Sequence, residues 1–173
     1  SYLVEVYMNT RSYDAALKSI DRIAKPSAQI LEAKQKILFQ LGTQSFANAD
    51  FEQALKYLNQ SIAIGQYNRQ TKADAYYWCG ESYYRLNRMV EAARDFNAYL
   101  QLTTQPNNEM YALANYNLGY IAFHRKDYTQ ASNYFQKYIQ LEKGENTTAL
   151  ADAYNRIGDC HLHVRNFEEA KHY

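Results

Sequence analysis

Glycine and proline are scarce in this sequence, at six and two of 173 residues. This scarcity excludes collagen-like and low-complexity chains and argues against a turn-rich all-β fold. The closest two glycines, Gly144 and Gly158, are 14 residues apart, so glycine-rich phosphate loops and the GxSxG nucleophile turn are absent. The two cysteines, Cys79 and Cys160, are too distant for a Cys-x-x-Cys pair, and we expect both to pack in the core.

An excess of either charge is also missing, because 19 Lys and Arg face 18 Asp and Glu, for a net charge of +1. General binders of nucleic acid or of acidic membranes need a basic excess, so we predict no nucleic-acid partner. No apolar run approaches the ~18 residues of a membrane span, and the mean hydropathy is −0.62. We therefore expect a helical chain without membrane insertion. Because it begins and ends inside expected helices, we also expect an excerpt of a longer protein.

An internal repeat organises the sequence. Four segments align without a gap: LGTQSFANADFEQALKYL (41–58), CGESYYRLNRMVEAARDF (79–96), LGYIAFHRKDYTQASNYF (118–135) and IGDCHLHVRNFEEAKHY (157–173). One glycine recurs at intervals of 38, 39 and 39 residues, at Gly42, Gly80, Gly119 and Gly158. An alanine keeps the same intervals and extends one unit further back, at Ala16, Ala54, Ala92, Ala131 and Ala170. Such a period predicts a repeat architecture.

Each unit has the pattern of two amphipathic helices joined by a short polar break. The breaks are expected at 47–50, 87–88, 125–127 and 165–166. The repeated glycine and alanine let the two helices approach closely, and large side chains four residues after each alanine fill the core. The predicted units of this single array are 1–26 (partial), 27–68, 69–105, 106–145 and 146–173 (partial). Expected helix starts are Thr71 with Asp74, Asn107 or Asn108, and Thr147 or Thr148.

The pairs Leu41-Gly42 and Leu118-Gly119, and Gly80 with Tyr83, together with the alanine column, resemble the tetratricopeptide repeat family. This resemblance implies an all-α, right-handed superhelical solenoid of antiparallel helix pairs. The period exceeds the family's 34 residues, so we expect each second helix to run one turn further, through Ile64, Leu102 and Leu141. The family's small residue late in that helix is replaced by Ser61, Tyr99 or Tyr138, and its closing proline is absent.

The openings of two units, Ala73 to Tyr83 and Ala151 to His161, are similar to long-period repeats of bacterial Tol-Pal accessory and outer-membrane assembly proteins. That similarity implies a periplasmic or outer-membrane-associated location.

The family resemblance also implies a concave, partner-binding groove lined by the first helices. Its register places five aromatic residues there, with three polar residues beside them: Tyr77, Tyr84, Tyr116, Tyr120 and Phe123, with Glu81, Arg85 and His124. The Lys and Asn of the family's carboxylate clamp are missing from these columns. Tyrosine is enriched at interfaces, but aromatic residues on helices are often buried, so core packing is the competing interpretation.

These observations predict a non-catalytic scaffold that binds a protein or an extended peptide and needs no cofactor. The alternative is a receptor for a peptidoglycan or glycan fragment, in which tyrosines stack on sugar rings. His124, His163 and Asp159 could form a two-histidine, one-carboxylate metal site, although a solvated polar edge explains them equally well. Exposed apolar surface at the two ends suggests end-to-end self-association.

Overall fold

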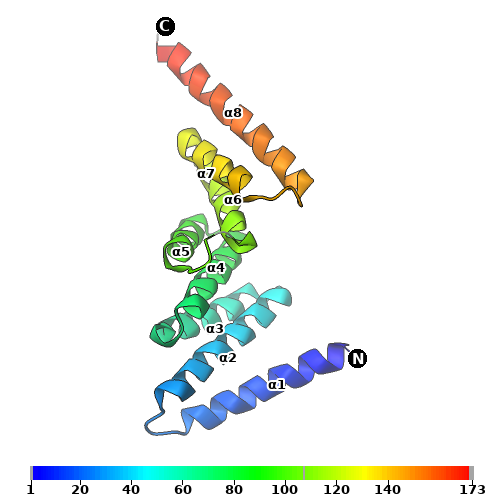
Figure 1. The fold of residues 1–173 in the computed structure, drawn as a ribbon, viewed down its shortest axis with the longest axis vertical. Helices are drawn as coiled ribbons and strands as arrows, with labels where there is room; N and C mark the ends of the chain where they lie inside the picture. The colour runs from blue at the N-terminus through cyan, green and yellow to red at the C-terminus, as the bar shows by residue number, and fades with distance from the viewer. Residues whose placement is uncertain (1, 107, 172–173) are drawn as a thin grey trace. The chain divides into compact units, whose positions relative to one another are not determined.

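The computed structural model describes residues 2–106 and 108–171 (Figure 1). Within these residues it contains eight α-helices and one short 3-10 helix, with no strand, so the predicted all-α fold is confirmed. The helices are α1 (Tyr2–Asp21), α2 (Ala28–Ala47), α3 (Phe51–Ala63), α4 (Arg69–Arg85), α5 (Met89–Leu102), α6 (Glu109–His124), α7 (Tyr128–Leu141) and α8 (Thr147–Lys171), with the 3-10 helix at Gly65–Tyr67.

The helices divide into two compact units, residues 1–104 with α1 to α5 and residues 105–173 with α6 to α8. The division lies within a residue of the predicted repeat boundary at 105–106. The expectation that all units form one continuous array stays a prediction. The second helices end at or next to the expected residues, since α3 ends at Ala63 and α5 and α7 end at Leu102 and Leu141.

Three hairpins, α2–α3, α4–α5 and α6–α7, are built on the repeated glycine. A Cβ placed on Gly80 would lie 2.8 Å from ring carbons of Phe96, and one on Gly119 would lie 2.8 Å from Phe135. In the α2–α3 hairpin the equivalent contact is between Gly42 and Leu58, at 2.6 Å. The alanines opposite, Ala54, Ala92 and Ala131, are completely buried. Each hairpin is therefore closed by one large side chain that lies against a backbone without a Cβ.

The hairpin turns share one backbone geometry. Ala49, Asn87 and Lys126 occupy equivalent positions and all have positive φ, at 61°, 60° and 66°. The following residue is the N-cap of the second helix, and at Asp50 and Asp127 its side chain accepts a hydrogen bond from the third backbone N–H of that helix. The left-handed residue reverses the chain and the cap starts the next helix.

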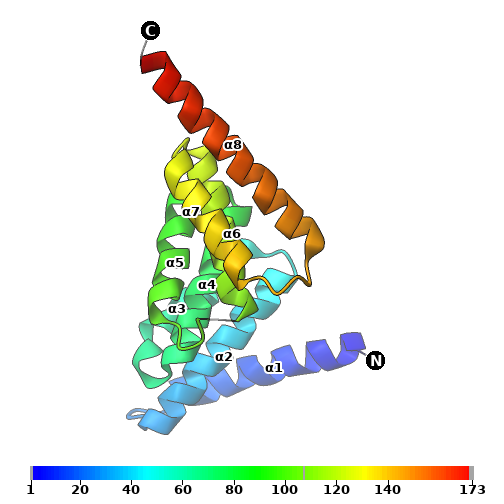
Figure 2. The ribbon, with the colours of Figure 1, turned by 45° about the horizontal axis from the view of Figure 1, so that its top comes forward.

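The first and last repeats differ from this pattern. The predicted break at Arg165 and Asn166 does not form, because α8 continues as one helix to Lys171, and α1 is likewise unbroken (Figure 2). Gly158 has no atom within 4 Å of a Cβ position, and Ala170 is exposed. The residue equivalent to Phe96 and Phe135 would be number 174, one beyond this sequence. Without that side chain on Gly158, nothing offsets the loss of helical hydrogen bonds at a turn.

Asparagine side chains begin three of the first helices. Asn68, Asn108 and Asn146 each accept a hydrogen bond from the backbone N–H three residues later, at 2.9, 2.9 and 3.0 Å. The expectation of Asn108 is met, whereas α4 starts before Thr71, and Asn146 caps α8 in place of Thr147 or Thr148. Asn107 lies outside the described residues. Asparagine is as good an N-cap as Ser or Asp, so the chain uses the first suitable oxygen.

Replacing the repeat glycines should have opposite effects in different repeats. Gly80→Ala forces a Cβ against the buried Phe96 ring, and we expect it to destabilise the chain by ~1–3 kcal/mol. Gly158→Ala adds a methyl group in open space on a helix, where alanine is favoured over glycine by about 1 kcal/mol. Denaturant unfolding of both variants measures the difference. Equal shifts of the two midpoints in the same direction would contradict this account of the crossing.

Candidate functional site

Tyr77 belongs to the core of the first unit and does not line an open surface. Its side chain is 3% exposed and its ring contacts Phe96 and Tyr99 edge-on, at centroid distances of 5.7 and 5.4 Å. Its hydroxyl donates a hydrogen bond to Glu81 at 3.0 Å. Tyr99 stands where the family pattern has a small residue, so this departure in the sequence was the signal that Tyr77 would be covered.

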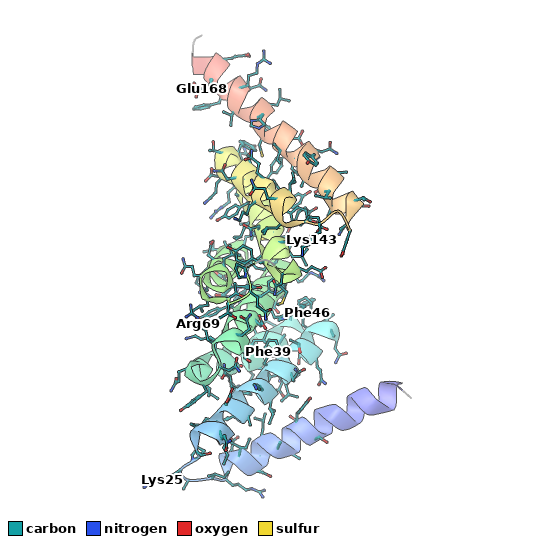
Figure 3. All side chains as sticks on the ribbon, in the orientation of Figure 1. Lys25, Phe39, Phe46, Arg69, Lys143 and Glu168 are labelled. Carbon is teal, nitrogen blue, oxygen red and sulfur yellow. The ribbon has the colours of Figure 1, made fainter. Side chains whose placement is uncertain are left out.

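A half-buried aromatic patch lies beside Tyr77, between α2 and α4. Phe46 of α2 meets Trp78 of α4 edge-to-face with ring centroids 5.0 Å apart, and the exposed Arg85 places its guanidinium carbon 5.4 Å from the centre of the Phe46 ring. Figure 3 labels Phe46 on α2. Tyr84 is half-buried on the same helix as Arg85. We name Phe46, Trp78, Tyr84 and Arg85 the α2–α4 patch; the register-based prediction missed Phe46 and Trp78.

Burial raises the pKa of Tyr84 above its usual value, with the nearby Glu81 carboxylate adding to the shift and Arg85 opposing it. The hydroxyl of Tyr84 therefore stays protonated at neutral pH and can donate a hydrogen bond. The patch thus combines apolar ring surface, a hydroxyl and a guanidinium on adjacent helical turns.

In the second unit, the predicted groove tyrosines are used internally. The hydroxyls of Tyr116 and Tyr120 on α6 both donate to one carboxylate oxygen of Asp152 on α8, the former at 2.6 Å. The Tyr116 ring also packs on Tyr138, with centroids 4.9 Å apart. Burial and the Asp152 carboxylate raise the pKa of Tyr116, and they raise the pKa of Tyr120 to about 12. These two tyrosines therefore attach α8 to the preceding hairpin.

Phe123 is half-buried and contacts side chains of α7 and α8. Its ring lies 5.5 Å from Tyr128 and 6.3 Å from His163, and His163 stacks on Tyr128 at 4.1 Å with nearly parallel planes. Asp159 pairs with Arg156 at 3.2 Å. In the part of the chain that the structure describes, no three His, Cys, Asp or Glu side chains come close enough to hold a metal ion. His124 is exposed and His163 is stacked, so the structure does not assemble the possible metal site.

Cys79 and Cys160 are both completely buried. Burial, reinforced by the Asp95 carboxylate, strongly raises the pKa of the Cys79 thiol, and burial raises the pKa of Cys160. A thiol in such surroundings is not the thiolate that nucleophilic catalysis requires. Asp95 is itself buried, and its pKa is raised by desolvation although Arg94 donates a hydrogen bond to it at 3.0 Å. These groups are closed to a substrate.

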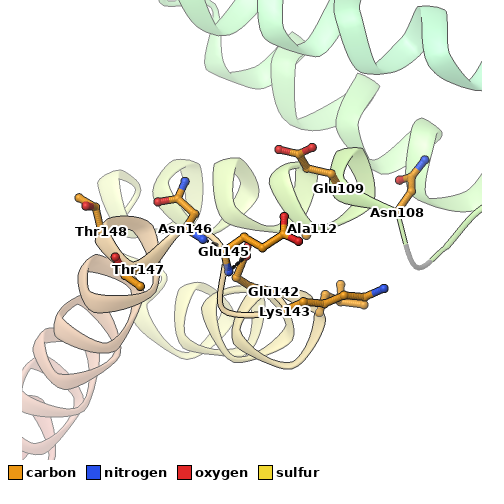
Figure 4. A pocket seen from close by; sticks show the side chains of 10 residues that line it. Asn108, Glu109, Ala112, Glu142, Lys143, Glu145, Asn146, Thr147 and Thr148 are labelled. Atoms are coloured by element: carbon orange, nitrogen blue, oxygen red, sulfur yellow. Dashed lines mark hydrogen bonds between the residues drawn. The ribbon is translucent and has the colours of Figure 1, made fainter.

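A pocket of about 610 Å³ lies in the second unit, where the start of α6 meets the α7–α8 loop (Figure 4). Three glutamates, Glu109, Glu142 and Glu145, line it. The Glu142 carboxylate accepts hydrogen bonds from the backbone N–H groups of Glu145 and Asn146, at 3.1 and 3.2 Å, and from the Tyr138 hydroxyl at 3.1 Å. This carboxylate therefore shapes the loop that precedes α8.

The described helices include none long and apolar enough to cross a bilayer. Their antiparallel pairs, repeated with one glycine crossing, place the chain among the helical-repeat proteins. Residues 39–109 match one family model described as "Tetratricopeptide repeat", and residues 112–144 match a second with the same description. Together these matches span more than half of the sequence, so this protein belongs to the tetratricopeptide repeat family.

Solved structures of low sequence identity share the fold. The crystal structure of BtubC (BKLC) from P. vanneervenii is similar with a TM-score of 0.68 at 15% identity, over 92% of this chain and 66% of BtubC. The crystal structure of MamA protein is similar with a TM-score of 0.60 at 19% identity, over 94% of this chain and 90% of MamA. The chain thus spans just under two thirds of the length of BtubC. No curated protein sequence matches it significantly.

The tyrosine contacts with Asp152 predict a loss of stability at alkaline pH. The unfolded chain releases the Tyr120 proton near pH 10, whereas the folded chain holds it until about pH 12. This contribution to stability is therefore fully present below pH 10 and is lost as the pH rises through about 12. We expect Tyr120→Phe to weaken the pH dependence of the melting temperature above pH 10.

The matched control is Tyr154→Phe, which alters an exposed tyrosine on α8. It should leave the alkaline pH dependence as in the wild type. An unchanged pH dependence in Tyr120→Phe would show that its hydrogen bond to Asp152 does not stabilise the folded state.

Proposed function

We propose that this protein is a non-catalytic scaffold that holds a partner protein through a peptide segment, and that the α2–α4 patch is its binding surface. Membership of the tetratricopeptide repeat family supports protein interaction in general, and the matching family models indicate no enzymatic family. The choice of surface rests on one observation, the Phe46 ring held between Trp78 and the exposed Arg85.

The chemistry of this patch favours a peptide. Trp, Tyr and Arg are the residue types that contribute most binding energy at protein interfaces, and the patch presents one of each. The edge-to-face contact with Trp78 fixes the Phe46 ring, so little side-chain freedom is lost on binding. Arg85 is a donor for a carboxylate. The expected ligand is therefore a peptide with an apolar side chain next to an acidic one.

The remaining predicted groove residues fit this proposal unequally. Tyr84, Glu81 and Arg85 stay at the proposed surface, whereas Tyr77, Tyr116 and Tyr120 stabilise the fold. Glycan recognition is the competing hypothesis for the same patch, since aromatic rings also stack on sugars. A location in the bacterial envelope, at the periplasm or outer membrane, remains part of the proposal and follows from the similarity of the repeat openings alone.

Peptides selected from a displayed library should test the binding surface. We expect the selected peptides to contain an acidic residue beside an apolar one, and expect Arg85→Ala and Tyr84→Ala each to weaken their binding by roughly 5- to 30-fold, that is by about 1–2 kcal/mol. Calorimetric titration gives the affinities. Melting temperatures within a degree or two of the wild type would show that the fold is intact.

Arg125→Ala is the matched control, because it removes an exposed arginine of the second unit. It should leave the affinity unchanged. Selected peptides that bind Arg85→Ala and Tyr84→Ala as well as the wild type would refute the α2–α4 patch. Binding of muropeptides or oligosaccharides, with no peptide selected, would favour the glycan hypothesis.

A further inference from the structure

One face of α8 is apolar and uncovered. Tyr154, Gly158 and Leu162 follow each other at four-residue spacing and so share this face. Tyr154 and Leu162 are 61% and 56% exposed, and a Cβ on Gly158 would meet no atom within 4 Å. Large apolar side chains are rarely exposed in succession without a partner.

In the complete hairpins the same face is covered by a second helix. The residues equivalent to Tyr154 are Leu38 and Asn115, four positions before Gly42 and Gly119, and both are buried. The glycines themselves lie against Leu58 and Phe135. The face of α8 around Gly158 is therefore shaped to receive a helix with a small residue at the crossing and a large one four positions later.

The second half of α1 has the sequence of such a helix. Ala16, Ile20 and Ile23 precede Ala54, Leu58 and Ser61 by 38 residues each. In the three complete hairpins the residues at these positions are completely buried: Ala54, Leu58 and Ser61, then Ala92, Phe96 and Tyr99, then Ala131, Phe135 and Tyr138.

In α1 the same positions are only partly covered. Ala16 and Ile20 are half-buried, and Ile23 is 40% exposed. Because α1 is one straight helix, its first half cannot fold back on its second half to cover them. These residues form a second-helix face that lacks a first helix.

We infer that α8 of one molecule and the second half of α1 of another complete a helical hairpin, so that the chain associates head to tail. Ile20 takes the position on Gly158 that Leu58 has on Gly42, and Ala16 lies at the crossing. Tyr154, Leu162 and Ile23, three of the exposed large apolar residues, come together at this contact. A heterologous contact of this kind continues from molecule to molecule unless the rotation between them closes a ring.

Sedimentation of the whole chain at rising concentration tests the inference. We expect a mass that increases with concentration beyond the dimer. Gly158→Leu fills the position that Ile20 would occupy, and overpacking of this kind should weaken association by about tenfold or more. The variant should still fold, because the added side chain enters open space. Gln140→Leu, which adds the same side chain at an exposed position of α7, is its control and should associate like the wild type.

Ile23→Glu blocks the other half of the contact. It places a charge in the apolar interface, and we expect a similar loss of association. Val90→Glu makes the same substitution at an exposed apolar residue of α5 and should have no effect. Since Ile23 lies beyond the end of α1 and is partly exposed, this variant tests the inference even if Gly158→Leu were to unfold.

Mixing the two variants distinguishes head-to-tail from symmetric association. Gly158→Leu retains a free α1 face and Ile23→Glu a free α8 face, so each should stay monomeric alone and an equimolar mixture should form a 1:1 dimer that grows no further. A wild-type chain that stays monomeric up to its solubility limit would overturn the inference. So would association that neither variant weakens, or variants that show no dimer when mixed.

Discussion

The close crossing of two helices at a glycine is the contact on which each hairpin depends. A large side chain at the same position of the second helix fills the space left by the missing Cβ, as Phe96 does at Gly80. Dispersion attraction falls steeply with distance, so this contact is effective only when the backbone approaches without a gap. The contact also sets the register of the pair, because a shift by one residue would place a different side chain on the glycine.

The second constraint is the pair of large residues late in the second helices. Tyr99 and Tyr138 are completely buried, and each packs against the first-helix tyrosine of its own repeat, Tyr77 or Tyr116. Buried tyrosine needs a partner for its hydroxyl, and the chain supplies carboxylates: Glu81 for Tyr77 and Asp152 for Tyr116. The abundance of tyrosine thus reflects a core that is partly polar. Only those aromatic residues that lack such a neighbour in the next helix remain available at the surface.

Much of this could be predicted from the sequence because the repeat carries the information. The glycine and alanine columns located the three hairpins, and the missing closing proline correctly indicated longer second helices. The prediction failed at 165–166, where the local signals of a turn are present but its stabilising contact is not. Asn166 and Phe167 match Asp50 and Phe51 in the repeat, yet the chain remains helical there. A polar break permits a turn, and tertiary packing decides whether the turn forms.

The same reasoning explains why the groove residues were harder to predict than the fold. Periodicity places a side chain on a face of its helix, but it does not state what the following helix puts opposite that face. Tyr120 and Tyr84 occupy successive positions of the partner-facing columns, at one and four residues after the repeat glycine. Tyr120 meets the Asp152 carboxylate of the next helix, which binds its hydroxyl within the unit. For Tyr84, the side chains that most affect its ionisation are Glu81 and Arg85 of its own helix. Whether a repeat tyrosine stabilises the fold or faces a ligand is therefore determined by one residue of the adjacent repeat, which the family pattern leaves free to vary.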